Sequence, residues 1–145
     1  AEETRSLLSY LERPEFPPRE VITPGSPIAI VRNAQGGRHF ALVRWGFVPY
    51  WAKEVGPKPL INARSETIFE KTSFKNAIRR RRCLIPADGF YEWKGDRPGQ
   101  KQTYYIHKPD HSLFAFAGVW EQWMGADGSE LESAAIITNG KRSQN

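Results

Sequence analysis

The sequence predicts an α+β fold that is mainly β, a single compact domain in which a strongly curved antiparallel sheet or barrel carries accessory helices. The chain has 145 residues, the usual length of one domain, and we expect residues 1–145 to form it. Short apolar segments separated by Gly, Pro and Asp fill its second half, which is typical of antiparallel strands. Aromatic residues make up 12% of the chain, so it has the side chains to fill a core.

The first part of the chain predicts a short helix and then a β-hairpin. Residues 3–12 place leucines on one helical face and predict an amphipathic helix. Residues 21–32 run into a strand, with Pro24-Gly25 as a turn signal near its start. A loop at residues 33–37 and a second strand at residues 39–45 complete the predicted hairpin.

The rest of the chain predicts one helix and a series of strands. Residues 46–59 are rich in Trp, Pro and Gly and predict an irregular segment. Residues 67–82 predict a loop followed by a helix, because Phe74, Ala77 and Ile78 recur at helical spacing. Five further strands are expected, at residues 83–86, 89–94, 103–108, 113–123 and 132–138.

The composition excludes several classes of protein. Cys83 is the sole cysteine, so the chain has no internal disulfide and no zinc cluster built from cysteines, which fits a reducing cytoplasm. Pro109 separates His107 from His111, so the two imidazoles cannot share a helical face as zinc ligands. The longest apolar run, residues 113–120, is too short to cross a bilayer. We therefore expect no metal, no cofactor and no membrane partner.

Basic side chains and aromatic rings point to a partner that carries phosphates. The formal net charge is +5, which favours association with polyanions. The run Arg79–Arg82 ends the predicted helix, where cations complement the helix dipole and need no partner. The same run is also suited to phosphate contacts, together with Lys71, Lys75, Arg44 and Lys53. The rings within residues 44–53 are equally suited to stacking on single-stranded bases and to forming the core.

Three further positions each allow a functional and a structural interpretation. Alternation within residues 89–94 surrounds Glu92 with aromatic neighbours, which favours a desolvated carboxyl with a raised pKa, although a paired structural glutamate is the alternative. Asn62 and Arg64 follow a proline-rich loop and either line a pocket or begin a helix. Cys83 follows four arginines, whose charge lowers a thiol pKa, but it also heads an apolar segment, as buried cysteines do.

Several sequence words, taken in order, resemble those of the SOS-response-associated peptidase family. They are WGFVPYWA, INARSET, RCLIPADGFYEW, FAFAGVWE and a strand ending in IIT, and the resemblance covers residues 17–139. It implies a barrel-like domain whose positively charged cleft binds single-stranded DNA at abasic sites. It implies a monomeric protein of the cytoplasm, associated with the nucleoid. It also implies a covalent DNA link, in which the amine and thiol of an N-terminal cysteine form a thiazolidine after autoproteolytic removal of the initiator residue.

The resemblance implies roles for individual residues as well. Asn62 and Glu92 are the catalytic candidates: Asn62 would orient the N-terminal group, and Glu92 would shuttle protons as the sugar ring opens and as the link is released. Arg64 would contact a phosphate, and Thr138 would touch the DNA backbone. The remaining DNA-binding candidates are Pro24 and Trp51, near positions that wedge or stack on DNA, and the basic residue Arg44.

The chain departs from the family pattern at both ends. It opens with AEETR, where nothing corresponds to the N-terminal cysteine, and it stops before the word that carries the family's catalytic histidine. We therefore expect these 145 residues to lack the extreme N-terminus and the C-terminal histidine segment, and to bind DNA without forming a thiazolidine. A non-catalytic module for single-stranded nucleic acid is the alternative. A peptidase that acts on other proteins would rest on the family's name alone.

Overall fold

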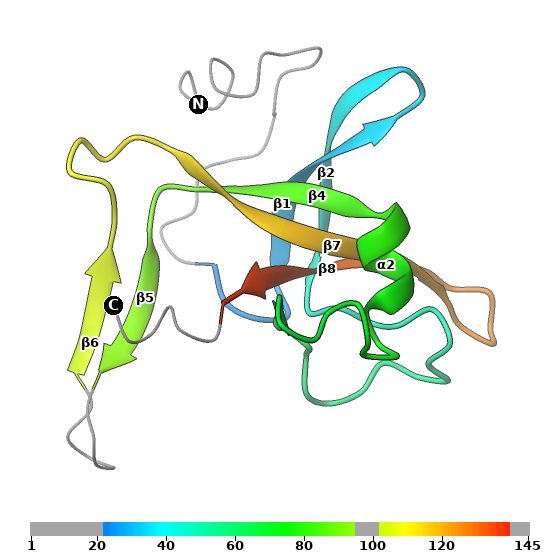
Figure 1. Ribbon diagram of the computed structural model, residues 1–145. Helices are drawn as coiled ribbons and strands as arrows, with labels where there is room; N and C mark the ends of the chain where they lie inside the picture. Colours follow the sequence, from blue (N-terminus) through cyan, green and yellow to red (C-terminus); the bar gives the residue numbers. More distant parts are fainter. Residues whose placement is uncertain (1–21, 95–101, 140–145) are drawn as a thin grey trace.

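Residues 22–94 and 102–139 are described by the computed structural model, and most of their strands close into a barrel (Figure 1). The barrel strands are β1 (Pro27–Ala34), β2 (Gly37–Trp45), β4 (Arg82–Ala87), β7 (Phe114–Met124) and β8 (Glu130–Thr138). The predicted hairpin is confirmed as β1 and β2, which pair antiparallel around a turn at Gln35 and Gly36. The predicted helix at residues 3–12 lies outside the described residues.

The barrel closes through one parallel pairing, so its sheet is mixed, whereas we expected an antiparallel sheet. The order β2-β1-β4-β7-β8 is antiparallel at every step, and β8 then pairs with β2 to complete the ring. Directions that alternate around a ring of five strands must leave one neighbouring pair parallel. That pair is β2 with β8, in the register Arg44↔Ser133 and Trp45↔Ala134. The mainly β, strongly curved fold is thus confirmed.

Two apolar clusters lie on opposite faces of the barrel wall. Neighbouring residues on a strand point to opposite faces, and Ala134 and Ala135 of β8 accordingly belong to different clusters. The interior cluster consists of Ile28, Ile30, Val43, Cys83, Ile85 and Ala134. The second cluster packs a helix and the preceding loop on the outer face, through Phe47, Ala63, Ile68, Phe74, Ala77, Ile78, Val119 and Ala135.

The predicted helix within residues 67–82 is confirmed but is short. Helix α2 spans Lys75–Arg80, and hydrogen-bonded turns occupy much of the segment from Thr67 to Phe74. The helix begins without a side-chain cap and ends at Arg81, because Arg82 already pairs with Val119 as the first residue of β4. Among the described residues, no helix is both long enough and apolar enough to cross a bilayer.

Strands β5 (Phe90–Lys94) and β6 (Gln102–Ile106) form a separate antiparallel ribbon that projects from the barrel (Figure 1). We expected these segments within the curved sheet. An aromatic cluster joins the ribbon to the barrel: the ring centroid of Phe90 lies 5.5 Å from that of Phe116 and 6.3 Å from that of Phe114. The ribbon is two strands wide, which alone gives marginal stability, so its position depends on these ring contacts.

Candidate nucleic-acid interface

The edge between β3 (Asn62–Arg64) and β8 brings three of the predicted site residues together. β3 pairs parallel with β8 in the register Asn62↔Ile136 and Arg64↔Thr138, and the amide of Ser65 donates to the carbonyl of Thr138 at 2.8 Å. Ala63 is fully buried in the outer cluster, so the exposed Asn62 and Arg64 share the opposite face of the strand. One exposed edge thus presents an amide and a guanidinium beside Thr138.

The turn at Pro24 is held against the end of β2. The amide of Ser26 donates to the carbonyl of Thr23 at 3.0 Å, and Gly25 has a φ of +91°, which are features of a type II turn with proline at its second position. Gly25 and Ser26 then exchange backbone hydrogen bonds with Trp45, at 2.7 and 2.9 Å. The predicted turn is confirmed, and it displays the exposed Pro24 in a fixed position.

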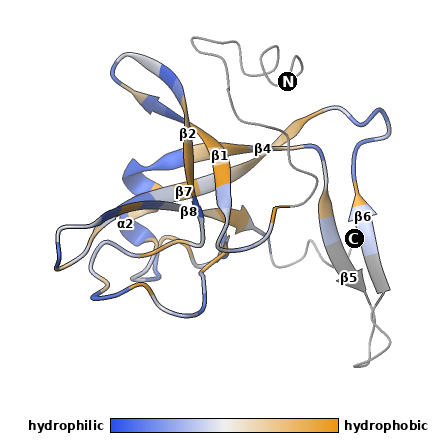
Figure 2. Ribbon diagram, turned by 180° about the vertical axis from the view of Figure 1, so that it is seen from behind, coloured by the Kyte–Doolittle hydropathy of each residue, from blue (hydrophilic) through white to orange (hydrophobic). Residues whose placement is uncertain are grey.

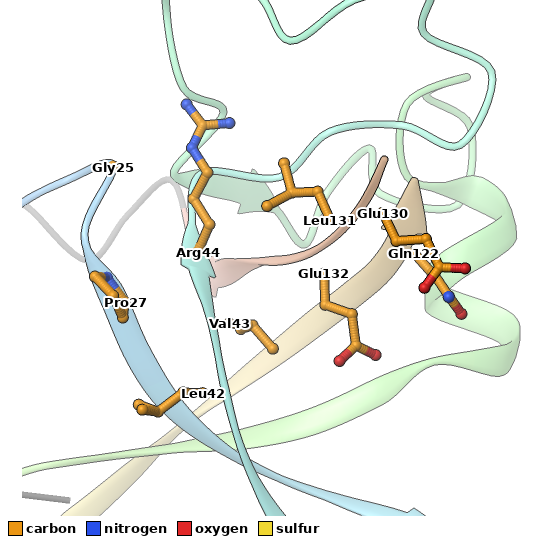
Figure 3. A pocket seen from close by; sticks show the side chains of 9 residues that line it. All are labelled: Gly25, Pro27, Leu42, Val43, Arg44, Gln122, Glu130, Leu131 and Glu132. Atoms are coloured by element: carbon orange, nitrogen blue, oxygen red, sulfur yellow. The ribbon is translucent and has the colours of Figure 1, made fainter. Parts of the chain in front are cut away.

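Arg44 lies in an open groove of about 670 Å³ that also contains acidic side chains (Figure 3). Its guanidinium donates to the carbonyl of Gly46 at 3.2 Å. Glu130 and Glu132 line the same groove, and Figure 3 shows the Arg44 side chain extending away from the Glu132 carboxylate. Arg32 neutralises Glu132 through an ion pair of 2.5 Å. A phosphate contact by Arg44 stays a prediction.

The aromatic rings of residues 44–53 divide between the core and the surface. Phe47 is buried, and its ring centroid lies 5.0 Å from that of Phe74. Tyr50 and Trp51 are 56% and 53% exposed. The indole of Trp51 donates to the carbonyl of Thr72 at 3.4 Å, which holds the ring in place. A pocket of about 420 Å³ opens here, lined by Tyr50, Trp51, Thr72, Lys75 and Asn76.

The arginine run divides in the same way. Arg81 forms an ion pair of 2.9 Å with Glu121, a residue that is only 4% exposed. Arg81 also donates a hydrogen bond to the carbonyl of Trp120. Arg82 donates through Nε to the carbonyl of Ile78 at 2.6 Å, at the end of α2. Arg79 and Arg80 are exposed. Part of the run is therefore structural, which its sequence could not indicate because Glu121 lies 40 residues away.

Glu92 lies on the ribbon, in register with Tyr104. The ribbon begins at the end of the barrel where β8 finishes. Gly118 of β7 pairs with Ile136, near the end of β8, and Phe116, which contacts Phe90 of the ribbon, lies two residues further along β7 in the same direction. Figures 1 and 2 show β8 ending on the side from which the ribbon projects. The fold thus directs Glu92 and the Asn62–Arg64 edge to one end of the barrel, and the described contacts do not join them directly.

Gly89 fixes the base of the ribbon. A Cβ atom at this position would overlap the ring of Tyr105, which packs directly over the glycine. The ring centroid of Tyr105 lies 5.1 Å from that of Tyr91 and 5.3 Å from that of His107. Sequence reasoning missed this ring row, because it depends on the pairing of β5 with β6.

Cys83 has the structural role that was one of its two interpretations, and the two neighbouring histidines contact each other. Cys83 is buried inside the barrel, and burial raises the pKa of its thiol to about 12 despite the opposing charge of Arg32. The thiol is therefore protonated at neutral pH and is not a nucleophile. His107 and His111 stack with ring centroids 4.0 Å apart. In the described part of the chain, no group of three His, Cys, Asp or Glu residues is arranged to hold a metal ion.

Comparison with known families agrees with this arrangement. The sequence profile of the family described as SOS response associated peptidase (SRAP) matches residues 1–144. The chain belongs to the SOS response associated peptidase family. The resemblance drawn from the sequence words is thus confirmed.

Relatives from bacteria and animals carry a common description. The chain is 40% identical over 131 residues to the abasic site processing protein YoqW of Bacillus subtilis (strain 168), a match that covers 89% of this chain and 58% of YoqW. It is 37% identical over 126 residues to the abasic site processing protein HMCES of Mus musculus, covering 66% of this chain and 36% of HMCES. The chain therefore spans little more than half the length of YoqW.

Solved structures share the fold. A crystal structure of a protein from Bordetella bronchiseptica superposes with a TM-score of 0.80 at 28% identity, covering 95% of this chain and 67% of that one. A phage-related protein from the same organism superposes with a TM-score of 0.73 at 33% identity, covering 95% of this chain and 64% of that one.

Proposed function

We propose that the protein processes abasic sites in single-stranded DNA. The observation that carries the proposal is the 40% identity, over 89% of this chain, to a protein described as abasic site processing. The exposed Asn62–Arg64 edge beside Thr138 supports it, because it offers hydrogen-bond donors and a positive charge to a sugar-phosphate backbone. The formal net charge of +5 favours the same partner.

The proposed chemistry is the closure of a thiazolidine in the complete gene product, on a cysteine that becomes the first residue. Its α-amine adds to the ring-opened sugar aldehyde, and loss of one water gives an imine. The thiol then adds to the imine carbon, and its proton passes to the nitrogen, which closes the ring. An α-amine has a pKa near 8, so a useful fraction is neutral at pH 7. Cys83 cannot replace this cysteine, because it is buried.

We assign roles on this reaction to Asn62 and Glu92. Asn62 orients the N-terminal amine, and the exposure of β3 leaves its amide free to do so. Glu92 moves protons as the sugar ring opens and as the link is released. Arg64 and Thr138 hold the flanking backbone, and their pairing in register keeps the two contacts next to each other.

Trp51 and Pro24 are the proposed apolar contacts. The exposed indole of Trp51 is anchored at one edge by its hydrogen bond to Thr72, which leaves a ring face for a base. Pro24 stands on a rigid turn and is suited to wedging between bases. We assign Arg44 a weaker backbone contact, since it shares its groove with acidic side chains.

The proposal is tested with the complete gene product and single-stranded DNA that carries one abasic site. We expect a shifted band that survives a denaturing gel, and none with the intact strand. These 145 residues alone should bind in a native gel without linking, since their sole cysteine is buried. Binding without covalent capture by the complete product would leave the alternative, a non-catalytic module for single strands.

Two substitutions separate binding from chemistry. Arg64→Ala should reduce the salt dependence of binding by about 0.7 in log–log slope, the value of one phosphate contact on a single strand. Arg38→Ala is the matched control, because Arg38 is an exposed arginine at the far end of β2 from the site. Glu92→Gln should slow covalent capture while binding stays near normal; an unchanged rate would make Glu92 structural.

A further inference from the structure

A row of three basic side chains continues from the Trp51 pocket along α2. Lys75 and Arg79 are four residues apart on the helix, which places them on one face. The amide of Lys75 bonds to the carbonyl of Lys71 at 2.9 Å, so the helical spacing extends back to Lys71. All three residues are exposed, and Figure 2 shows α2 coloured mostly hydrophilic. We call Lys71, Lys75 and Arg79 the α2 row.

Two of the three charges of the α2 row, those of Lys71 and Lys75, do not stabilise the helix, whereas Arg79 stands in its last turn, where a cation is favourable. Cations are favoured at the C-terminal end of a helix, whereas Lys75 is the first residue of α2 and Lys71 lies four residues before it, so both lie toward the positive end of the dipole. The first turn contains no acidic residue that would compensate. Like charges four residues apart also repel one another. The fold alone therefore gives no reason for the positions of Lys71 and Lys75, and a bound anion would offset their cost.

The α2 row differs from the structural arginines that follow it. Arg81 is committed to Glu121, and Arg82 to the last turn of α2. No ion pair of Lys71, Lys75 or Arg79 is found among the described residues. Glu70 is the acidic neighbour of the row. It precedes Phe74 by four residues and Ile78 by eight, so its helical spacing matches these two core residues and not the basic row.

The α2 row is continuous with the aromatic pocket. Lys75 lines that pocket together with Trp51, and the Trp51 indole bonds to Thr72, one residue after Lys71. Eight residues of helical rise separate Lys71 from Arg79, a length of about 12 Å. Neighbouring members of the row are therefore about 6 Å apart along the helix axis. A strand stacked on Trp51 can therefore continue along the row, with its phosphates beside these cations.

We infer that the α2 row is a phosphate-binding track that extends the single-stranded DNA footprint beyond the abasic site. The inference rests on the proposed function, since it takes single-stranded DNA as the ligand. It predicts that strand length on the Trp51 side of the abasic site contributes to affinity through charge, without a role in the covalent step.

The test measures binding of the complete gene product to a single-stranded oligonucleotide over a range of salt concentrations. Lys75→Gln/Arg79→Gln should lower the log–log slope by about 1.4, because two phosphate contacts are lost. Lys75→Arg/Arg79→Lys should keep the original slope, since both charges remain. Lys75→Gln alone should lower the slope by about 0.7, the value of one phosphate contact. Arg38→Gln removes one charge from the remote hairpin and should leave the slope within a few tenths of the original.

Covalent capture distinguishes the two proposals. If abasic DNA is captured and the Gln double variant keeps the full slope, the track is wrong and the proposed function stands. If nothing is captured but the slope falls, the track stands and the chemistry is wrong. A slope that falls equally for Arg38→Gln and Lys75→Gln would show a general effect of net charge and would overturn the track. A decrease confined to duplex DNA would overturn the assignment to single strands.

Discussion

Replacing Arg81 by leucine should strongly destabilise the protein, although Arg81 lies within a run that resembles a DNA-binding patch. The Glu121 residue is 4% exposed, and its carboxylate accepts from Arg81 at 2.9 Å and from the amide of Gln122 at 3.0 Å. Arg81→Leu would leave this buried charge without its cation. Breaking a buried pair in this way costs about 3–5 kcal/mol. For a chain of this length we expect the Tm to fall by roughly 10–20 °C.

Urea and thermal unfolding of three variants test this reasoning. Arg80→Leu changes an exposed neighbour and should stay within about 0.5 kcal/mol of the parent. Arg81→Leu/Glu121→Gln removes the uncompensated charge and should recover a large part of the loss. A cost below about 1 kcal/mol for Arg81→Leu, or no recovery in the double variant, would refute the assignment of Arg81 to the fold. Loss of DNA binding in Arg81→Leu would then report phosphate contact and not unfolding.

Three further results are expected. The Cys83 thiol has a pKa of 9.0 when unfolded and about 12 when folded, so between these pH values the unfolded chain binds fewer protons than the folded one. The free energy of unfolding should therefore fall in this range by up to about 1.4 kcal/mol per pH unit. In Cys83→Ala it should fall less steeply. Gly25→Ala should cost about 1–2 kcal/mol in urea unfolding because of its positive φ, whereas Gly56→Ala, with open space around it, should not destabilise the protein. Trp51→Ala should weaken binding to single-stranded DNA roughly 5- to 150-fold at unchanged Tm.

The barrel could be predicted from the sequence because its signals are local. Short apolar segments bounded by turn residues identified β1, β2, β4, β7 and β8, and Pro24-Gly25 marked a turn that the structure contains. The separate ribbon of β5 and β6 could not be predicted, since strand patterns do not state which strands pair. The parallel closure was hidden for the same reason.

The site was predictable only in part. The exposed Trp51 and the buried Phe47 occur in one aromatic segment, and the sequence left both interpretations open. Their separation follows from Phe74, which is distant in the chain and packs on Phe47. Arg81 and Arg79 are likewise indistinguishable in a run of four arginines until Glu121 is placed beside one of them. Residue types in the sequence can thus indicate a candidate site. Contacts with residues remote in sequence determine which of its side chains are buried or paired and which are exposed for binding.

The position of the β3–β8 edge follows from the construction of the barrel itself. A closed ring of five strands needs one parallel pair, and β8 meets β2 in that pair through Ser133 and Ala134. β2 ends at Trp45, so it leaves the edge of β8 open beyond Ala134. β3 occupies that open edge in parallel, at Ile136 to Thr138, which sets Asn62 and Arg64 beside Thr138. A longer β2 would fill the edge and displace β3, so the length of one barrel strand determines where the candidate site can form.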